Sequence, residues 1–143
     1  MHLVIDGFRG DVNKMWDREL VREFLLDCPS RLGMTRITEP NVLEYTAPKS
    51  ADSGVSGFVI IAESHISIHT FPRRNYVNID IFSCMPFDHE RALAAAKDLF
   101  HLAEVKTWLL DRGLEWLDSR QGLDQMSHQR DTLQAAGLNN RRD

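Results

Sequence analysis

The stretch from Gly54 to Cys84, GVSGFVIIAESHISIHTFPRRNYVNIDIFSC, constrains the fold more than any other part of this chain. It contains one β-branched and aromatic run and two runs in which apolar and polar residues alternate, at 58–61, 65–69 and 77–82. An alternation with a period of two is typical of strands that bury one face. The stretch therefore predicts three consecutive strands. Glu63, Ser64 and His65 separate the first two, and because none of them is a usual turn residue, another role is expected for them.

The flanking segments predict further strands and two helices. Strand patterns occur at 2–6, at 105–110, and as one strand or a pair within 34–46. Gly7 and Gly10 are expected to end the first of these strands.

An amphipathic helix is predicted from Trp16 to Leu26, closed by Pro29, and a second helix is predicted after Asp88, its N-cap. This order of elements indicates an α+β fold, an antiparallel β-sheet with helices packed on one face. The other face of the sheet is expected to meet a partner subunit.

The composition predicts one globular domain. Because 43% of the 143 residues are hydrophobic, the chain can bury one sizeable core, which we place in residues 1–118. Residues 119–143 are expected to form a polar tail with at most a short helix around 131–136. The net charge of -4 argues against nucleic acid and anionic membranes as partners. With no secretory signal and no spanning segment, a cytoplasmic location is expected.

Single polar residues in the 54–84 stretch have ordinary explanations. A histidine on a half-buried strand is usually hydrogen-bonded or exposed, and a buried cysteine is usually a small apolar residue, as expected for Cys28. His65 and His69 are too far apart for one metal ion, roughly 13 Å along an extended strand, so no metal is predicted. A serine hydrolase is disfavoured because no G-x-S-x-G turn surrounds Ser64.

Taken together, the strings GVSG and AESHISIHTFP and the strand ending at Cys84 resemble the small bacterial and archaeal class of S-adenosylmethionine decarboxylases. These are self-processing, pyruvoyl-dependent enzymes of polyamine and spermidine biosynthesis. The resemblance is strongest over 54–84, is supported by HLVID and by the order of elements to about residue 110, and does not cover the tail.

The resemblance implies that the chain cuts its own backbone between Glu63 and Ser64. The Ser64 hydroxyl would attack the Glu63 carbonyl to form an ester, and elimination would leave a pyruvoyl group at residue 64. That group forms a Schiff base with the substrate, so pyridoxal phosphate is not needed. Ser56 and His69 would serve processing, with His69 as the base for elimination. Cys84 would protonate the substrate carbon, as a thiol can near neutral pH.

The resemblance also implies a homodimer with two shared sites, in which Ser64 and Cys84 of one protomer meet Ser56 and His69 of the other. Strand alternation agrees with this. In a regular strand Ser64 shares a face with Ile66 and Ile68, whereas His69 lies on the other face and roughly 16 Å further along.

The substrate is predicted from a departure from the family pattern. The family has an aromatic residue, Pro and Glu after I-H-T, and the Glu binds the ribose hydroxyls of S-adenosylmethionine. This chain has Phe71-Pro72-Arg73, and a guanidinium cannot accept those hydrogen bonds. The family's second aromatic residue, before GVSG, is also unmatched except by nearby Tyr45.

We therefore favour L-ornithine or L-arginine as the substrate, with Glu44 or Asp52 binding its distal cation. S-adenosylmethionine remains the alternative if Arg73 points to solvent. A catalytically inactive regulatory homologue is a further alternative, although such a protein would not need the whole set Ser56, Glu63, Ser64, His69 and Cys84.

Overall fold

A computed structural model describes residues 1–112 of the chain. Its elements are, in order, β1 (His2–Phe8), α1 (Val12–Trp16), α2 (Arg18–Arg31), β2 (Asn41–Tyr45), η1 (Ser50–Asp52), β3 (Gly54–Ile61), β4 (Ser64–Phe71), η2 (Pro72–Arg74), β5 (Tyr76–Ser83), α3 (His89–Phe100) and β6 (Glu104–Leu110). The tail predicted at 119–143, its helix at 131–136 and the domain boundary at 118 lie outside the described residues.

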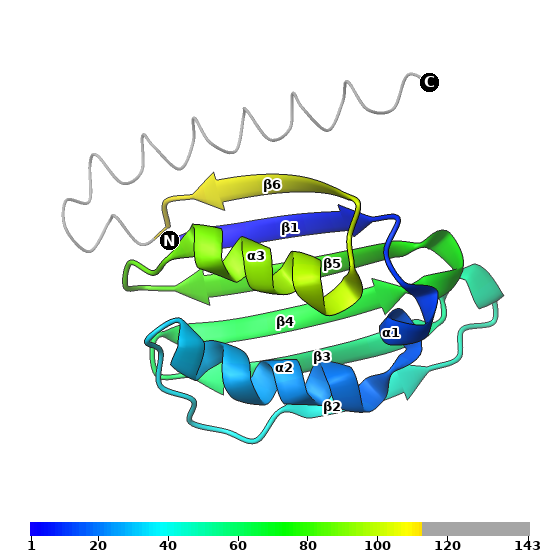
Figure 1. The fold of residues 1–143 in the computed structure, drawn as a ribbon. Helices are drawn as coiled ribbons and strands as arrows, with labels where there is room; N and C mark the ends of the chain where they lie inside the picture. Colours follow the sequence, from blue (N-terminus) through cyan, green and yellow to red (C-terminus); the bar gives the residue numbers. More distant parts are fainter. Residues whose placement is uncertain (113–143) are drawn as a thin grey trace.

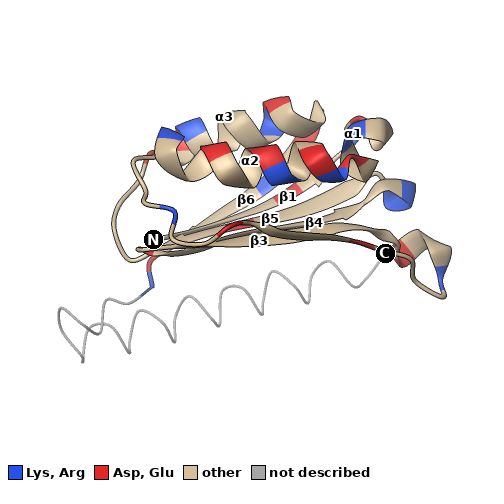
Figure 2. Cartoon of the chain, turned by 90° about the horizontal axis from the view of Figure 1, so that it is seen from below, with Lys and Arg blue, Asp and Glu red and all other residues tan. Residues whose placement is uncertain are grey.

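Within residues 1–112, six strands form one sheet in the order β2-β3-β4-β5-β1-β6, and every neighbouring pair is antiparallel. Helices α2 and α3 lie side by side over one face of this sheet (Figure 1). Seen from below, the helices and the sheet form two layers, with charged residues distributed along α2 and α3 (Figure 2). The predicted α+β fold, an antiparallel sheet with helices on one face, is confirmed.

The core lies between the helices and the sheet. It collects the inward residues of the strands, among them Val59, Ile66, Ile68, Ile79 and Ile81, which are fully buried. Because the opposite residues of each strand point outward, the period-two pattern of the sequence separates the two faces. Gly57 lets α2 approach the sheet, since a Cβ there would lie 2.9 Å from Leu25 and 3.0 Å from Val42.

The helix ends follow capping rules. Asp88 caps α3 as predicted, because its side chain accepts a hydrogen bond from the Arg91 backbone N–H at 2.9 Å. Asp11 and Asp17 cap α1 and α2 in the same way. The second of these caps also divides the single helix expected around Trp16 into two.

Three details of the predicted elements, at Gly7, at Pro29 and at the turn between β3 and β4, are wrong. Gly7 does not end the first strand but pairs with Val77 and Val105 inside β1, where a larger residue would meet Leu102. Pro29 does not close α2, which runs to Arg31, because a proline in the last turn disrupts few helical hydrogen bonds.

The segment 34–46, predicted to contain one strand or a pair, contains one named strand, β2, and an isolated bridge between Arg36 and Ile61. The turn between β3 and β4 consists of Ala62 and Glu63, so Ser64 and His65 belong to β4.

The outer face of the sheet is not covered by any helix within residues 1–112 (Figure 2). Several large apolar side chains are exposed on β2 and β3 of this face: Leu43, Tyr45, Phe58 and Ile60. None of the described helices is both long enough and apolar enough to cross a membrane.

Candidate active site

Ser56 and His69 form a hydrogen-bonded pair on the outer face of the sheet. They lie directly opposite each other in the β3–β4 register, and Ser56 Oγ is 2.9 Å from His69 Nδ1. The residues on either side of them in their strands, such as Val55, Gly57 and Ile68, are buried on the helix side. Strand alternation therefore directs both polar side chains away from the core, where a ligand can reach them.

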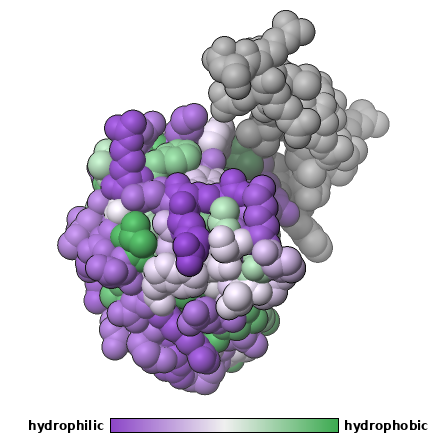
Figure 3. Space-filling view, turned by 90° about the vertical axis from the view of Figure 1, so that its right-hand side faces the viewer, coloured by the Kyte–Doolittle hydropathy of each residue, from purple (hydrophilic) through white to green (hydrophobic). Residues whose placement is uncertain are grey.

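A pocket of about 240 Å³ adjoins this pair, lined by Asp52, Phe71, Arg74, Tyr76 and Asn78. Asn78 is the register partner of His69 on β5, which places the pocket beside the pair. The rings of Phe71 and Tyr76 stack with their centroids 5.8 Å apart and form an aromatic wall. The end of the molecule that carries η1 and η2 is mainly hydrophilic, with scattered apolar residues (Figure 3).

A carboxylate holds the polar side of this pocket in place. Asp6 Oδ1 accepts hydrogen bonds from the Tyr76 hydroxyl at 2.8 Å and from Asn78 Nδ2 at 2.9 Å, and Asn78 Nδ2 also donates to the Tyr76 oxygen. Burial, and then the hydrogen bond and charge of Asp6, raise the pKa of Tyr76 to about 12, so its hydroxyl stays protonated. No hydrogen bond from the described residues goes to the Asn78 side-chain carbonyl oxygen, which remains as an acceptor.

The Glu63–Ser64 bond lies at the opposite end of the sheet, immediately after the Ala62–Glu63 turn. The Ala62 N–H donates to the Thr35 carbonyl at 2.8 Å, and the Thr35 N–H donates to Glu63 Oε2 at 3.2 Å. Ser64 has a φ of 155°, a region that residues other than glycine rarely adopt. Backbone strain therefore lies at the residue that follows the bond expected to break.

Cys84 contacts this bond through its backbone. Its N–H donates to the Glu63 carbonyl oxygen at 3.0 Å, and its side chain is exposed. An N–H at this position polarises the carbonyl and would stabilise an oxyanion formed by attack on it. The predicted cleavage site and Cys84 are thus brought together, by the pairing of Ser64 with Ser83 at the end of β4 and β5.

The two groups of residues are far apart in one chain. Ser56 pairs with His69 near one end of the β3–β4 hairpin, and Ile61 pairs with Ser64 at the other. Five residue steps along a strand correspond to about 17 Å. The expected distance between His69 and Ser64 therefore agrees with the structure. The expected face of Ser64 agrees as well, because Ser64 pairs with the buried Ile61 and Ser83, although its Oγ also lies 3.2 Å from Nδ1 of the neighbouring His65.

The predicted substrate residues are divided between the two faces. Glu44 pairs with the buried Val55 and so projects to the helix side, away from the pocket, which corrects its proposed role. Asp52 lines the pocket but is ion-paired with Arg74. Arg73 is exposed in η2, and Tyr45 is exposed on the outer face opposite Gly54.

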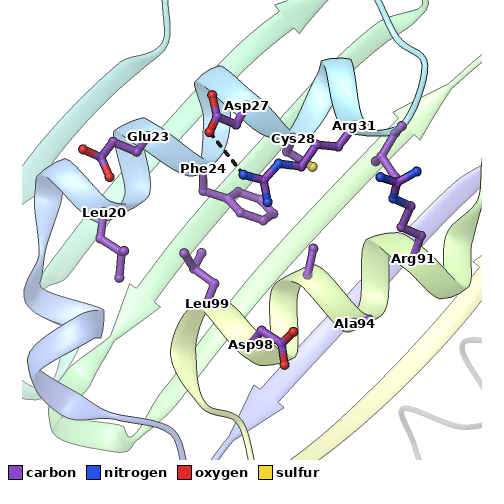
Figure 4. Close-up of a pocket in the computed structure, with 12 residues that line it drawn as sticks. Leu20, Glu23, Phe24, Asp27, Cys28, Arg31, Arg91, Ala94, Asp98 and Leu99 are labelled. Carbon is purple, nitrogen blue, oxygen red and sulfur yellow. Dashed lines mark hydrogen bonds and ion pairs between the residues drawn. The ribbon is translucent and has the colours of Figure 1, made fainter.

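A second cavity, of about 390 Å³, lies between α2 and α3 on the other side of the sheet (Figure 4). Leu20, Phe24 and Leu99 form its apolar walls, and an Asp27–Arg31 ion pair of 3.3 Å crosses its rim. Burial raises the pKa of Cys28, at its base, to about 12, so this thiol is a poor nucleophile. The cavity is separated from Ser56 and His69 by the sheet.

Comparison with known proteins identifies the family. The S-adenosylmethionine decarboxylase family matches residues 1–113. The chain belongs to this family. An S-adenosylmethionine decarboxylase proenzyme from Geobacillus sp. (strain WCH70) is 32% identical over 113 residues, which are 79% of this chain and 86% of that protein. The corresponding proenzyme from Clostridium botulinum (strain Loch Maree / Type A3) is 37% identical over 108 residues, 73% of this chain and 88% of that protein.

The crystal structure of the adenosylmethionine decarboxylase from Aquifex aeolicus has the same fold, with a TM-score of 0.66 and 26% identity over 78% of this chain and 88% of that one. The predicted family and the prediction of an enzyme of the carboxy-lyase class are confirmed. The names of these relatives give no support to ornithine or arginine as the substrate.

Sequence reasoning missed Asp6, Tyr76 and Asn78. Each occupies an outward position in its strand, which alternation reveals, but their meeting depends on the pairing of β1 with β5. His65 was rejected as a metal ligand and given no specific catalytic role.

Proposed function

We propose that this chain is a self-processing, pyruvoyl-dependent decarboxylase that cleaves itself between Glu63 and Ser64. The observation that carries the proposal is the Glu63 carbonyl, which accepts the Cys84 N–H at 3.0 Å next to a strained Ser64. The Ser64 hydroxyl is the nucleophile, the Glu63 carbonyl is the polarised electrophile, and the Cys84 N–H is the donor to the oxyanion. The fold that holds them is that of the matching family.

The residues present fit a pyruvoyl group at position 64. Ser64 supplies the three carbons, and scission makes it the first residue of the fragment 64–143. When formed, the group supplies an electron sink for loss of carbon dioxide. Cys84 is the proton donor to the substrate carbon, since its exposed side chain follows β5 beside the cleavage turn. Ser56 orients His69 through their 2.9 Å hydrogen bond, and His69 removes the proton that elimination requires.

The complete site requires two copies of the chain. About 17 Å of strand separates Ser64 from His69 within one protomer, which is too far for direct proton transfer. A two-fold dimer through the outer faces would bring the Glu63–Ser64 end of one copy to the Ser56–His69 end of the other. It would also cover the exposed apolar residues of β2 and β3.

We propose S-adenosylmethionine as the substrate. The relatives that cover most of this chain carry that name, and Phe71 presents an aromatic wall to the pocket. The acceptor missing at Arg73 has a neutral substitute in the carbonyl oxygen of Asn78, a pocket-lining residue whose amide nitrogen is held by Asp6 and Tyr76. A neutral acceptor binds a ribose hydroxyl less strongly than a carboxylate does.

L-Ornithine or L-arginine is the second candidate, because Arg73 provides donors where the family has an acceptor. It is disfavoured by the ion pair of Asp52 with Arg74 and by the position of Glu44 on the helix side. Carbon dioxide release should be measured with S-adenosylmethionine, L-ornithine and L-arginine offered separately to the purified protein.

Turnover of S-adenosylmethionine alone supports the proposal, and turnover of an amino acid alone refutes the assigned substrate. An intact chain after long incubation, with no fragments 1–63 and 64–143 on a denaturing gel, refutes self-processing and favours the inactive homologue. Ser64→Ala is the control that removes the nucleophile.

A further inference from the structure

Self-cleavage begins when the Ser64 hydroxyl loses its proton, and the structure contains a group suited to receive it. Among the described residues, the one side-chain atom hydrogen-bonded to Ser64 Oγ is His65 Nδ1, at 3.2 Å. His69 cannot do this in the same chain, because it lies at the far end of β4. The Glu63 carboxylate is held by the Thr35 N–H instead.

The imidazole of His65 is held in a defined orientation. It projects from β4 on the outer face, between its register partners Ile60 and Phe82. Its ring meets the Phe82 ring edge to face, with centroids 5.8 Å apart and planes at 67°. The Arg112 guanidinium lies over Phe82 at 4.2 Å and donates to His2 Nδ1, which steadies the aromatic neighbour of His65. Because the neighbours of His65 on β3 and β5, Ile60 and Phe82, are apolar, they offer no side-chain hydrogen bond to Nδ1. Its partner is the Ser64 hydroxyl.

We propose that His65 is the general base of the first step of self-cleavage, a role separate from that of His69. The inference rests on the proposed cleavage at Glu63–Ser64. His65 Nδ1 takes the proton of Ser64 Oγ as that oxygen bonds to the Glu63 carbonyl carbon. The Cys84 N–H stabilises the oxyanion. When the carbon–nitrogen bond breaks, the proton passes from His65 to the amino nitrogen of Ser64, and the ester has formed without any external reactant.

Two histidines on one strand then divide the work. His65 acts within its own chain on the ester-forming step, and His69 of the second protomer acts on the elimination that follows. A strained φ at Ser64 favours the first step, because leaving the peptide geometry relieves it.

The test compares full-length proteins with His65→Asn, His65→Ala, His69→Ala and, as a matched control, His89→Ala. His89 is a partly exposed histidine on α3, on the other side of the sheet. Cleavage is followed on denaturing gels with time, before and after treatment with hydroxylamine, which cuts esters but not peptide bonds under mild conditions. Loss of a general base slows a step by about 100-fold to 10,000-fold.

We expect His89→Ala to cleave like the unmodified chain. His69→Ala should accumulate the ester and be cut by hydroxylamine between residues 63 and 64. His65→Asn and His65→Ala should remain intact under both treatments, and added imidazole should restore cleavage of His65→Ala, because the side chain is exposed in the single chain.

Cleavage of the His65 variants within about threefold of the unmodified rate, small against the effect expected of a general base, overturns the inference but leaves the proposed function intact. A second outcome also overturns the inference: His65→Ala keeps the circular dichroism of the unmodified chain, cleaves slowly and is not accelerated by imidazole. That pattern indicates a structural role for His65. An unmodified chain that neither cleaves nor is cut by hydroxylamine refutes the proposed function and the inference together.

Discussion

A mixture of two inactive variants should regain the ability to process one of its chains. Ser64→Ala lacks the nucleophile, and His69→Ala lacks the elimination base. Alone, each variant should stay unprocessed. Within one protomer the two positions are five residue steps apart on β4, about 17 Å, so neither chain can repair itself.

The expected yield follows from the geometry of a shared site. If the two chains assemble at random, about half of the dimers are mixed, as for any two-fold pair of equally abundant subunits. In a mixed dimer one site combines both substitutions and is inactive. The other combines Ser64 of the His69→Ala chain with His69 of the Ser64→Ala chain and is complete. About half of the His69→Ala chains should therefore be cleaved, and no Ser64→Ala chains.

The assay is co-expression of the two variants with tags of different mass, followed by a denaturing gel and intact-mass measurement. Fragments 1–63 and 64–143 should arise from the His69→Ala chain only. The absence of any cleavage in a mixture shown to contain mixed dimers would refute the shared site. Cleavage of the His69→Ala chain without its partner would refute the role of His69.

Further changes test the pocket, the core and the cysteines. Asn78→Ala should raise KM for the substrate about tenfold by removing one acceptor, whereas Asn41→Ala on β2 should leave it unchanged; steady-state kinetics would decide. Thr70→Val should lower the free energy of unfolding by about 1–3 kcal/mol in urea, because the buried Thr70 hydroxyl donates to the Met15 carbonyl and accepts the Val55 N–H. Iodoacetamide at pH 8 should add once, at exposed Cys84, because the raised pKa of buried Cys28 keeps it a thiol; two adducts on the folded chain would contradict this.

The sequence alone determined the elements and the chemistry-bearing stretch. A β-branched and aromatic run was sufficient for β3, and a period of two was sufficient for β4 and β5, because alternation indicates which face of a strand is buried. Asp88 was also recognisable as an N-cap, because an aspartate before a helical pattern can accept a hydrogen bond from a backbone N–H of the first turn. The Glu63-Ser64-His65 string stood out because its residues are poor formers of a hairpin turn.

Only the tertiary structure decided which residues meet. Strand register places Ser56 against His69, the Cys84 N–H on the Glu63 carbonyl, and Asp6 beside Tyr76 and Asn78. These pairs join segments up to 72 residues apart, and their alignment depends on the packing of the whole sheet rather than on local pattern.

The tertiary structure also overrode two expectations drawn from the local sequence, at Glu44 and at Pro29. Glu44 faces the helices because β2 is aligned with β3 in that register, and Pro29 is tolerated because it falls in the last turn of α2. The distance between the two ends of the β3–β4 hairpin follows from strand length. That distance makes a second copy of the chain necessary for the proposed site.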